Sequence, residues 1–201
     1  MVPAPPPLWL PIDSMRPSNR SKILDAAMRV IDRDGVTAVT FESVSSEAGI
    51  TRGGMLYHFP SRDALIIAIH AHLAANWEAS MEALAGKPLA ELTSQERHMA
   101  YARACAQSAT RAELQFMLES ATDQALAEPW AAVLERWAPP VPSDTQDEVA
   151  LDDFIARLAA DGLWVYESLS STPLDKDLKA AIAERLAKML RSSSKARGPR
   201  G

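Results

Sequence analysis

The segment from Thr40 to Pro60 constrains the fold of this chain more than any other part of the sequence. It predicts two short helices, residues 41–48 and 51–58, each of which begins next to a threonine that can cap it. Gly49 lies between them and allows a tight turn with positive φ, and Pro60 ends the second helix. Two short helices joined by a tight turn have the layout of a helix-turn-helix.

The second short helix carries the residues that a helix-turn-helix would present to DNA. Its N-terminal end must bear short or polar side chains in order to approach base edges in the major groove. Leu56 and Phe59 are expected to continue its buried side. Gly53 and Gly54 each cost roughly 1 kcal/mol in a helix relative to alanine, which indicates a close approach of the backbone to DNA. The outward surface is expected to consist of Thr51, Arg52, Gly53 and Met55.

The rest of the sequence predicts an all-α protein of about nine helices. Ala, Leu, Glu, Arg and Met dominate from residue 20 onward, whereas alternating β-branched residues bounded by hairpin turns are absent. A first helix over 20–34 should end at Gly35, and a fourth should begin after Ser61 and end before Gly86. The later helices are expected at 94–109, 111–123, 129–137, 144–168 and 174–190.

Charge is divided along the chain, although the whole chain is acidic with a net charge of −5. Residues 16–62 carry seven Lys/Arg against five Asp/Glu, whereas residues 63–190 carry ten against twenty. A mildly basic front half on an acidic body suits a DNA-binding module joined to a module with another task. The single cysteine excludes an intramolecular disulfide, and no apolar run is long enough to span a membrane. We therefore expect a cytoplasmic protein.

Over residues 20–66 the sequence closely resembles the TetR family of transcriptional regulators. The resemblance rests above all on the stretch from Thr40 to Leu65, TFESVSSEAGITRGGMLYHFPSRDAL. Two positions depart from the family pattern. Val44-Ser45 replaces the usual Ile-Ala pair, and Arg62 replaces the usual lysine while it keeps the charge and can bind phosphate bidentately.

The resemblance implies a role for each matching residue and a partner for the chain. The residues expected to hold phosphates are Thr40, Tyr57, His58 and Arg62. Those expected to face the bases are Thr51, Arg52, Gly53 and Met55. It further implies a homodimer on a palindromic operator, whose half-sites lie about one helical turn or a multiple apart. A small-molecule effector would change the half-site separation and release the repressor.

The sequence also predicts the domain boundaries. We expect a DNA-binding domain over 17–77, with its helix-turn-helix at 40–59, and an effector-binding and dimerisation domain over 78–191. Residues 1–16 should be a disordered Pro-rich arm, and residues 192–201 a disordered basic tail. Met15 directly precedes the first helix, so the arm is a candidate upstream extension.

Apolar residues at helical spacing in the second domain are candidates for two surfaces. The aromatic and Met residues that would line an effector cavity or fill the core are Met81, Met99, Tyr101, Cys105, Phe116, Met117, Trp130, Trp137, Phe154 and Trp164. The dimer candidates on the last two helices are Leu151, Ile155, Leu158, Gly162, Val165, Leu178, Ile182, Leu186 and Met189. Arg103, Gln107, Arg111 and Glu113 are candidates for orienting a polar ligand group.

Two other functions remain open at this point, a helical enzyme and a protein-binding module, each with a helix-turn-helix-like N-terminal domain. The sequence shows no Ser/His/Asp or Cys/His arrangement, carboxylate pair or phosphate-binding glycine loop. His70 and His72 are two apart on a helix and so face different directions. We therefore expect no catalytic residue, metal or cofactor.

Overall fold

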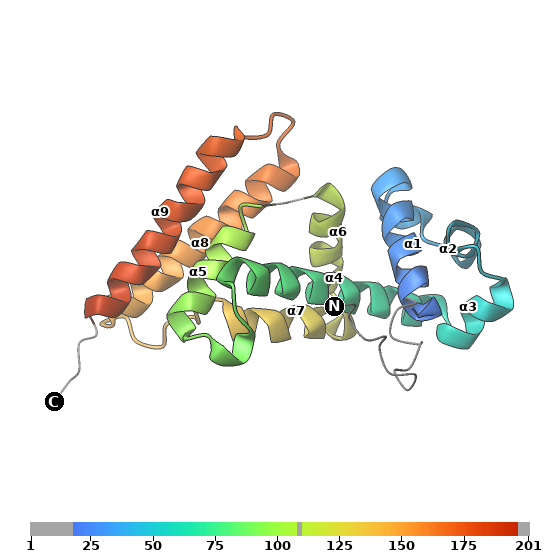
Figure 1. Cartoon of the computed structure of the whole chain (residues 1–201), viewed down its shortest axis with the longest axis horizontal. Helices are drawn as coiled ribbons and strands as arrows, with labels where there is room; N and C mark the ends of the chain where they lie inside the picture. Colours follow the sequence, from blue (N-terminus) through green and yellow to red (C-terminus); the bar gives the residue numbers. More distant parts are fainter. Residues whose placement is uncertain (1–17, 108–109, 197–201) are drawn as a thin grey trace, which may run out of the picture. The chain divides into compact units, whose positions relative to one another are not determined.

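The computed structural model of this chain describes residues 18–107 and 110–196, with side chains as far as Leu190. Within these residues all regular structure is helical, with nine α-helices and two short 3-10 helices (Figure 1). The all-α prediction is therefore confirmed. The helices form two compact units, which meet in the sequence between Leu65 and Ile66. The boundary expected after residue 77 lies later in the same helix, Arg62–Ala85, as this division, and the expected arm, 1–16, lies outside the described residues.

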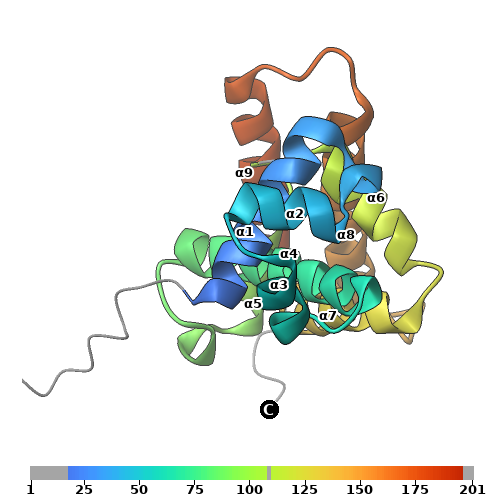
Figure 2. The ribbon, with the colours of Figure 1, turned by 90° about the vertical axis from the view of Figure 1, so that its right-hand side faces the viewer.

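The first unit contains three helices and the beginning of a fourth (Figure 2). They are α1 (Asn19–Asp34), η2 (Val36–Ala38), α2 (Phe41–Ala48), α3 (Arg52–His58) and the first residues of α4 (Arg62–Ala85). Their apolar faces meet in one core, because α1 packs on α2 and α2 on α3. The fully buried side chains of this core include Ile23, Val30, Val39, Val44, Met55 and Leu65.

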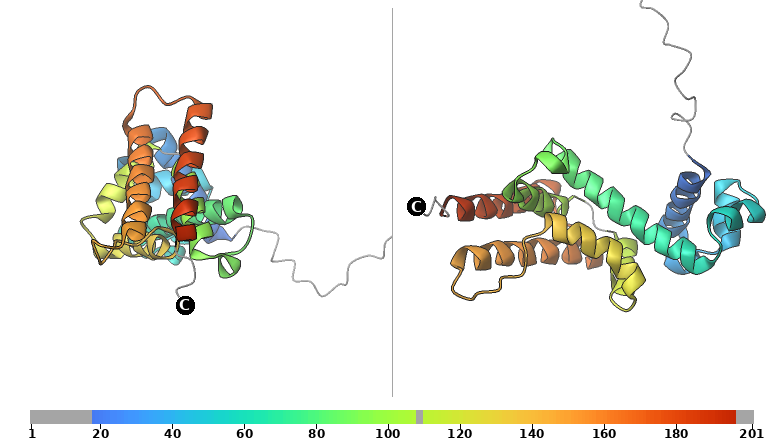
Figure 3. Two further views of the ribbon diagram at one scale, coloured as in Figure 1. Left: turned by 90° about the vertical axis from the view of Figure 1, so that its left-hand side faces the viewer. Right: turned by 90° about the horizontal axis from the view of Figure 1, so that it is seen from below.

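The second unit contains the rest of α4 and six further elements. They are η3 (Leu89–Glu91), α5 (Ser94–Ala104), α6 (Arg111–Ser120), α7 (Gln124–Trp137), α8 (Glu148–Leu169) and α9 (Lys176–Ala196). Helices α8 and α9 lie side by side in an antiparallel pair, which Figure 3 shows in its left view. α5 packs against α9 on the inner side of this pair. The outer face of the pair is covered by no other described helix.

The largest differences from the expected helix boundaries occur in three helices. α7 begins at Gln124, and Pro129 lies inside it, whereas the sequence suggested that this proline opens the helix. The Asp123 carboxylate caps the earlier start by accepting from the Ala125 N–H, 2.8 Å away. α9 continues to Ala196, into the expected tail, because no glycine or proline interrupts the chain there. α5 ends at Ala104, earlier than residue 109.

Candidate functional sites

The turn between α2 and α3 is fixed by one left-handed residue and one cap. Gly49 has φ 66° and ψ 34°, a conformation that residues with a Cβ adopt at a cost. The N–H of Ile50 then donates to the Ser45 carbonyl oxygen at 3.0 Å. The Thr51 hydroxyl accepts from the N–H of Gly54 at 3.2 Å and so starts α3. The predicted helix-turn-helix is present with this geometry.

The two glycines of α3, Gly53 and Gly54, lack a side chain for different physical reasons. A Cβ added at Gly54 would lie 2.7 Å from Cγ2 of Ile50, so this glycine is needed for packing within the turn. A Cβ added at Gly53 would meet only the Thr51 hydroxyl, at 4.0 Å. Gly53 therefore leaves the outer surface of α3 flat, as close contact with another molecule requires. Only Gly53 fits the expected approach to DNA, whereas Gly54 serves the fold.

The N-terminal end of α3 is exposed, with one correction to the expected surface. Thr51, Arg52 and Gly53 face solvent. Met55 is fully buried, so its expected place among base-facing residues is wrong. It shares a face with Phe59, four residues later, whereas Leu56 is 43% exposed. Met55 thus takes the buried position that was expected for Leu56, whereas Phe59 is buried as expected.

The expected phosphate contacts gather at the N-terminus of α2 and the end of α3. The Thr40 hydroxyl accepts from the N–H of Ser43 at 3.0 Å and caps α2, which leaves a partial positive charge at that end. Nε of Arg62 donates to the carbonyl oxygen of Val39 at 3.3 Å and thus lies beside this cap. Tyr57 is 85% exposed and packs edge-to-face on the half-buried His58, with ring centroids 5.1 Å apart.

Arg52 has a partner that sequence reasoning missed. Its Nη1 lies 3.0 Å from Oε1 of Glu42 on α2, and both side chains are largely exposed. Such a pair contributes little to stability, because solvent screens both charges. The pair holds a carboxylate next to the side chain that is expected to read a base. No sequence spacing indicated this contact, since Glu42 and Arg52 belong to different helices.

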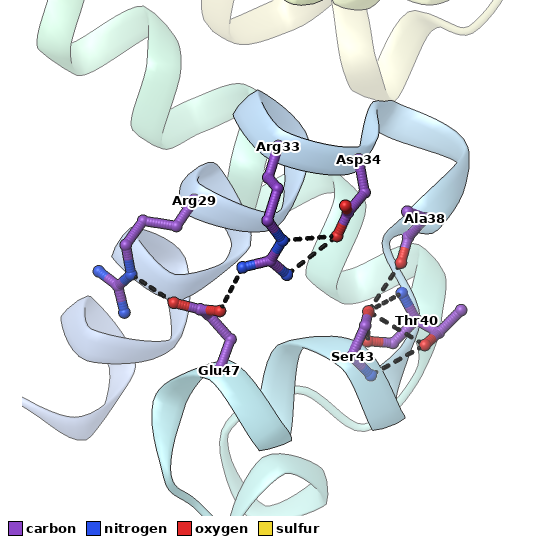
Figure 4. A network of polar contacts seen from close by, with 7 residues as sticks. All are labelled: Arg29, Arg33, Asp34, Ala38, Thr40, Ser43 and Glu47. Carbon is purple, nitrogen blue, oxygen red and sulfur yellow. Dashed lines mark hydrogen bonds and ion pairs between the residues drawn. The ribbon is translucent and has the colours of Figure 1, made fainter.

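A network of ion pairs joins α2 to α1 (Figure 4). Oε1 of Glu47 lies 2.7 Å from Nε of Arg29, and its Oε2 lies 2.9 Å from Nη1 of Arg33. Hydrogen bonds from Arg33 and then Arg29 lower the pKa of the Glu47 carboxyl. Arg33 also pairs with Asp34 at 2.9 Å. The network orients α2 and thereby the turn that presents α3.

The expected cavity residues of the second unit are mostly core. Six of the ten are buried, namely Met81, Tyr101, Cys105, Phe116, Trp130 and Trp137. The half-buried four are Met99, Met117, Phe154 and Trp164. The Cys105 thiol has its pKa raised to about 12, chiefly by burial, so it is chemically inert at neutral pH.

Part of this core is an aromatic cluster with a polar centre. Nε1 of Trp130 donates to Nδ1 of His70 at 3.0 Å. The His70 ring packs edge-to-face on Phe116, with centroids 4.9 Å apart. Trp77 contacts both Tyr101 and Trp130. Nε2 of His70 is buried and forms no hydrogen bond with the described residues. In the sequence, His70 was considered only as a metal ligand together with His72, and its place at the centre of this cluster was not predicted.

A cleft of about 410 Å³ opens between α5, α7 and the N-terminal half of α8. None of the ten expected cavity residues lines it, nor do the four expected polar groups, Arg103, Gln107, Arg111 and Glu113. It is lined by Ser94, Arg97, His98, Leu134, Glu135, Arg136, Ala138, Pro140, Ala150, Asp153 and Arg157. Sequence reasoning missed this cleft because its polar residues come from three separate helices.

An apolar stripe runs along the outer face of α8 and α9. The expected interface residues that are exposed on it are Ile155, Leu158, Gly162, Val165, Leu178 and Met189, while Leu151 and Ile182 are half-buried. A Cβ added at Gly162 would meet nothing within 4 Å. Leu186 is only 7% exposed and packs inside the chain, so its expected place on the outer face is wrong. Exposed Tyr166 and Leu169 extend the stripe and were not expected.

The described residues contain neither a membrane-spanning helix nor a cluster of metal ligands. None of the described helices combines the length and apolarity needed to cross a membrane. Within the same residues, no group of three His, Cys, Asp or Glu side chains is placed to hold a metal ion.

Comparison with known families gives two matches. The family described as bacterial regulatory proteins, tetR family, matches residues 23–69. The family described as tetracyclin repressor-like, C-terminal domain, matches residues 95–191. The first match covers the helix-turn-helix and the second covers α5 to α9, so together they account for most of both units.

Individual relatives agree with these matches. An HTH-type transcriptional regulator, BetI of Rhizobium meliloti (strain 1021), is 26% identical over 187 residues, which cover 87% of this chain and 90% of that protein. BetI of Brucella anthropi is 31% identical over 78 residues, which cover 39% of this chain and 40% of that protein.

Solved structures share the fold. A TetR family member from Streptomyces coelicolor A3 has a TM-score of 0.54 and 24% identity, over 85% of this chain and 98% of that one. A protein from Saccharomonospora viridis, solved in complex with choline, has a TM-score of 0.61 and 19% identity, over 86% of this chain and 95% of that one.

Proposed function

The chain belongs to the TetR family of bacterial regulatory proteins, and on this premise we propose that it represses transcription as a homodimer that binds a palindromic operator and leaves it when a small molecule binds. Family membership confirms the predicted DNA-binding transcriptional regulator and the prediction that the chain is not an enzyme. The observation that carries the proposal is the exposed N-terminal end of α3, braced by α2 across the Gly49 turn.

The proposed contacts with DNA follow from this surface. Thr51, Arg52 and Gly53 would enter the major groove, where a guanidinium recognises guanine through two hydrogen bonds. The α2 N-terminus at Thr40 and the nearby Arg62 would hold one phosphate. Tyr57 would contact the backbone at the other end of α3. Phosphate contacts of this kind position the helix but carry no sequence information.

The apolar stripe on α8 and α9 supports a homodimer. Ile155, Leu158 and Leu169 are each more than half exposed, and an exposed row of this kind on two adjacent helices is typical of an interface. A two-fold pair of these helices would bury the stripe in a four-helix bundle. A dimer with two α3 helices would require a nearly palindromic operator.

The second unit is the proposed binding domain for the effector. The structure of a transcriptional regulator from Saccharomonospora viridis that shares this fold was solved in complex with choline. In this chain the aromatic cluster around His70 offers rings and one buried N–H without a partner among the described residues. We infer that the effector binds in this unit and shifts the population toward a dimer whose α3 helices no longer match the operator. The protein would act in the cytoplasm, where the operator lies.

Selection of genomic fragments by the purified full-length protein tests this function. The proposal expects a few fragments, each with an inverted repeat upstream of a gene, to be enriched and to lose binding as salt rises. A uniform recovery of all fragments would contradict sequence-specific binding. Products and substrates of the neighbouring genes are then the first compounds to test for release of the DNA.

A further inference from the structure

The cleft between α5, α7 and α8, hereafter the polar cleft, lies in the second unit and is separate from the aromatic cluster in its lining residues. The mechanism proposed above does not use it. Its charged residues are Arg97, Glu135, Arg136, Asp153 and Arg157, and its apolar wall is formed by Leu134, Ala138, Pro140 and Ala150. The cleft thus combines arginines with an apolar surface.

Arg97 differs from the other two arginines of this cleft in its contacts with the described residues. Its Nη2 donates to the Ser94 hydroxyl at 3.0 Å. Its Nε is buried and forms no hydrogen bond with any described residue. None of the ion pairs found among the described residues includes Arg97. A buried N–H on a charged group is costly without a partner, so an acceptor from outside the chain would stabilise this arrangement.

The other two arginines of the polar cleft are held by the protein itself. Glu78 binds Arg136 with two hydrogen bonds of 2.7 and 2.6 Å and neutralises its charge. Nη1 of Arg157 donates to the Pro139 carbonyl oxygen at 2.8 Å, and its Nε is 3.7 Å from the Asp161 carboxylate. The acids Glu135 and Asp153 also line the cleft.

His98 lines the polar cleft as a neutral group. Burial, followed by the charges of Arg97 and Arg157, lowers its pKa to about 4. Its ring therefore adds no charge at neutral pH, but it retains one N–H donor and one acceptor nitrogen. The effect of both guanidinium charges on this ring agrees with the position of all three residues in the lining of one cleft.

We propose that the polar cleft binds a small organic carboxylate, with the carboxylate on Arg97 and the apolar body against Leu134, Ala138 and Pro140. A carboxylate would supply acceptors for the buried Nε and the neighbouring Nη of Arg97, the two-bond arrangement that guanidinium favours. The volume of about 410 Å³ suits a ligand of this size. Because none of its lining residues belongs to the aromatic cluster, this site would be a second one in the unit.

Titration calorimetry on the full-length protein without DNA tests this site. The probes are benzoate and hexanoate, with benzamide and benzylamine as neutral and cationic counterparts, all at one ionic strength. The proposal expects at least one carboxylate to bind with a Kd of about 1 mM or lower, and its uncharged counterpart to bind about tenfold more weakly or not at all. Equal binding of benzoate and benzamide would overturn it, as would no carboxylate binding at about 10 mM.

Two variants locate the binding. Arg97→Gln should weaken the carboxylate about tenfold or more, whereas Arg185→Gln, at an exposed arginine on α9, should leave it unchanged. Arg97→Lys keeps the charge and loses the planar pair of donors, so its affinity should fall between the two. Circular dichroism melting checks that each variant is folded. Unchanged affinity in folded Arg97→Gln would show that the carboxylate binds elsewhere and would refute the proposal.

Discussion

His70 on α4 accepts a 3.0 Å hydrogen bond at Nδ1 from the indole N–H of Trp130 on α7. The bond requires Nδ1 to be unprotonated, so the proton of the neutral ring lies on Nε2. Burial lowers the pKa of His70, and the charge of Asp123 only partly opposes this effect. The second unit is therefore built around a histidine that favours the neutral form.

The stability of the second unit should decrease as the pH falls from about 6.5 toward 4.5. His70 and His98 both have a pKa below the ordinary value of 6.5, that of His98 about 4. The unfolded chain then binds protons in this window that the folded chain does not, so acid favours unfolding. Urea unfolding at pH 7.5 and pH 5.0 measures the difference, which His98→Gln should reduce. Equal free energies of unfolding at both values would contradict this assignment.

Met55→Ala should destabilise the first unit by about 2–5 kcal/mol, because it leaves a cavity in a closed core. Leu56→Ala, on the exposed side of the same helix, should change the stability by only about 0.5 kcal/mol. Chemical denaturation of both variants gives the comparison. A stable Met55→Ala protein with an altered base preference would instead restore Met55 to the DNA-contacting surface.

Arg52 and Glu42 should have opposite effects on operator affinity. Arg52→Ala should weaken specific binding by about 1–3 kcal/mol if the guanidinium contacts a base. Glu42→Gln should strengthen binding, because it removes a carboxylate that pairs with Arg52 at 3.0 Å and repels phosphate. Fluorescence anisotropy with a labelled operator measures both. Weaker binding by Glu42→Gln would mean that the ion pair positions Arg52 for the base.

Leu158→Glu should convert the protein to a monomer, because it places a charge in the centre of the apolar stripe on α8. Leu118→Glu is the matched control, since this α6 leucine is 62% exposed, against 53% for Leu158, but lies outside the stripe. Sedimentation velocity gives the mass of each. A dimeric Leu158→Glu protein would place the subunit interface elsewhere.

The helix-turn-helix could be predicted from sequence because its constraints are local. Thr40, Gly49 and Thr51 cap or turn the chain within a few residues of themselves, so their types alone indicate their conformation. The same holds for Ser61, whose hydroxyl accepts from the N–H of Ala64 at 3.1 Å. Patterns of this kind do not depend on what the rest of the chain packs against.

Errors arose where neighbouring helices decide which side of a helix is buried. Met55 and Leu56 are both apolar, and the packing of α3 determines which of them enters the core. Leu186 fits a dimer stripe by spacing, but α9 turns it toward its own unit. The polar cleft and the Trp130–His70 hydrogen bond join helices distant in sequence, and no local pattern indicates such contacts.

The affinity of the full-length protein for a selected upstream fragment, compared with a scrambled duplex of the same composition at one salt concentration, tests the central claim most directly. The proposed regulator should bind the selected fragment at least about 10³-fold more tightly. Arg52→Ala should reduce this preference more than it reduces binding to the scrambled duplex. Equal affinity for the two duplexes would contradict sequence-specific recognition by α3.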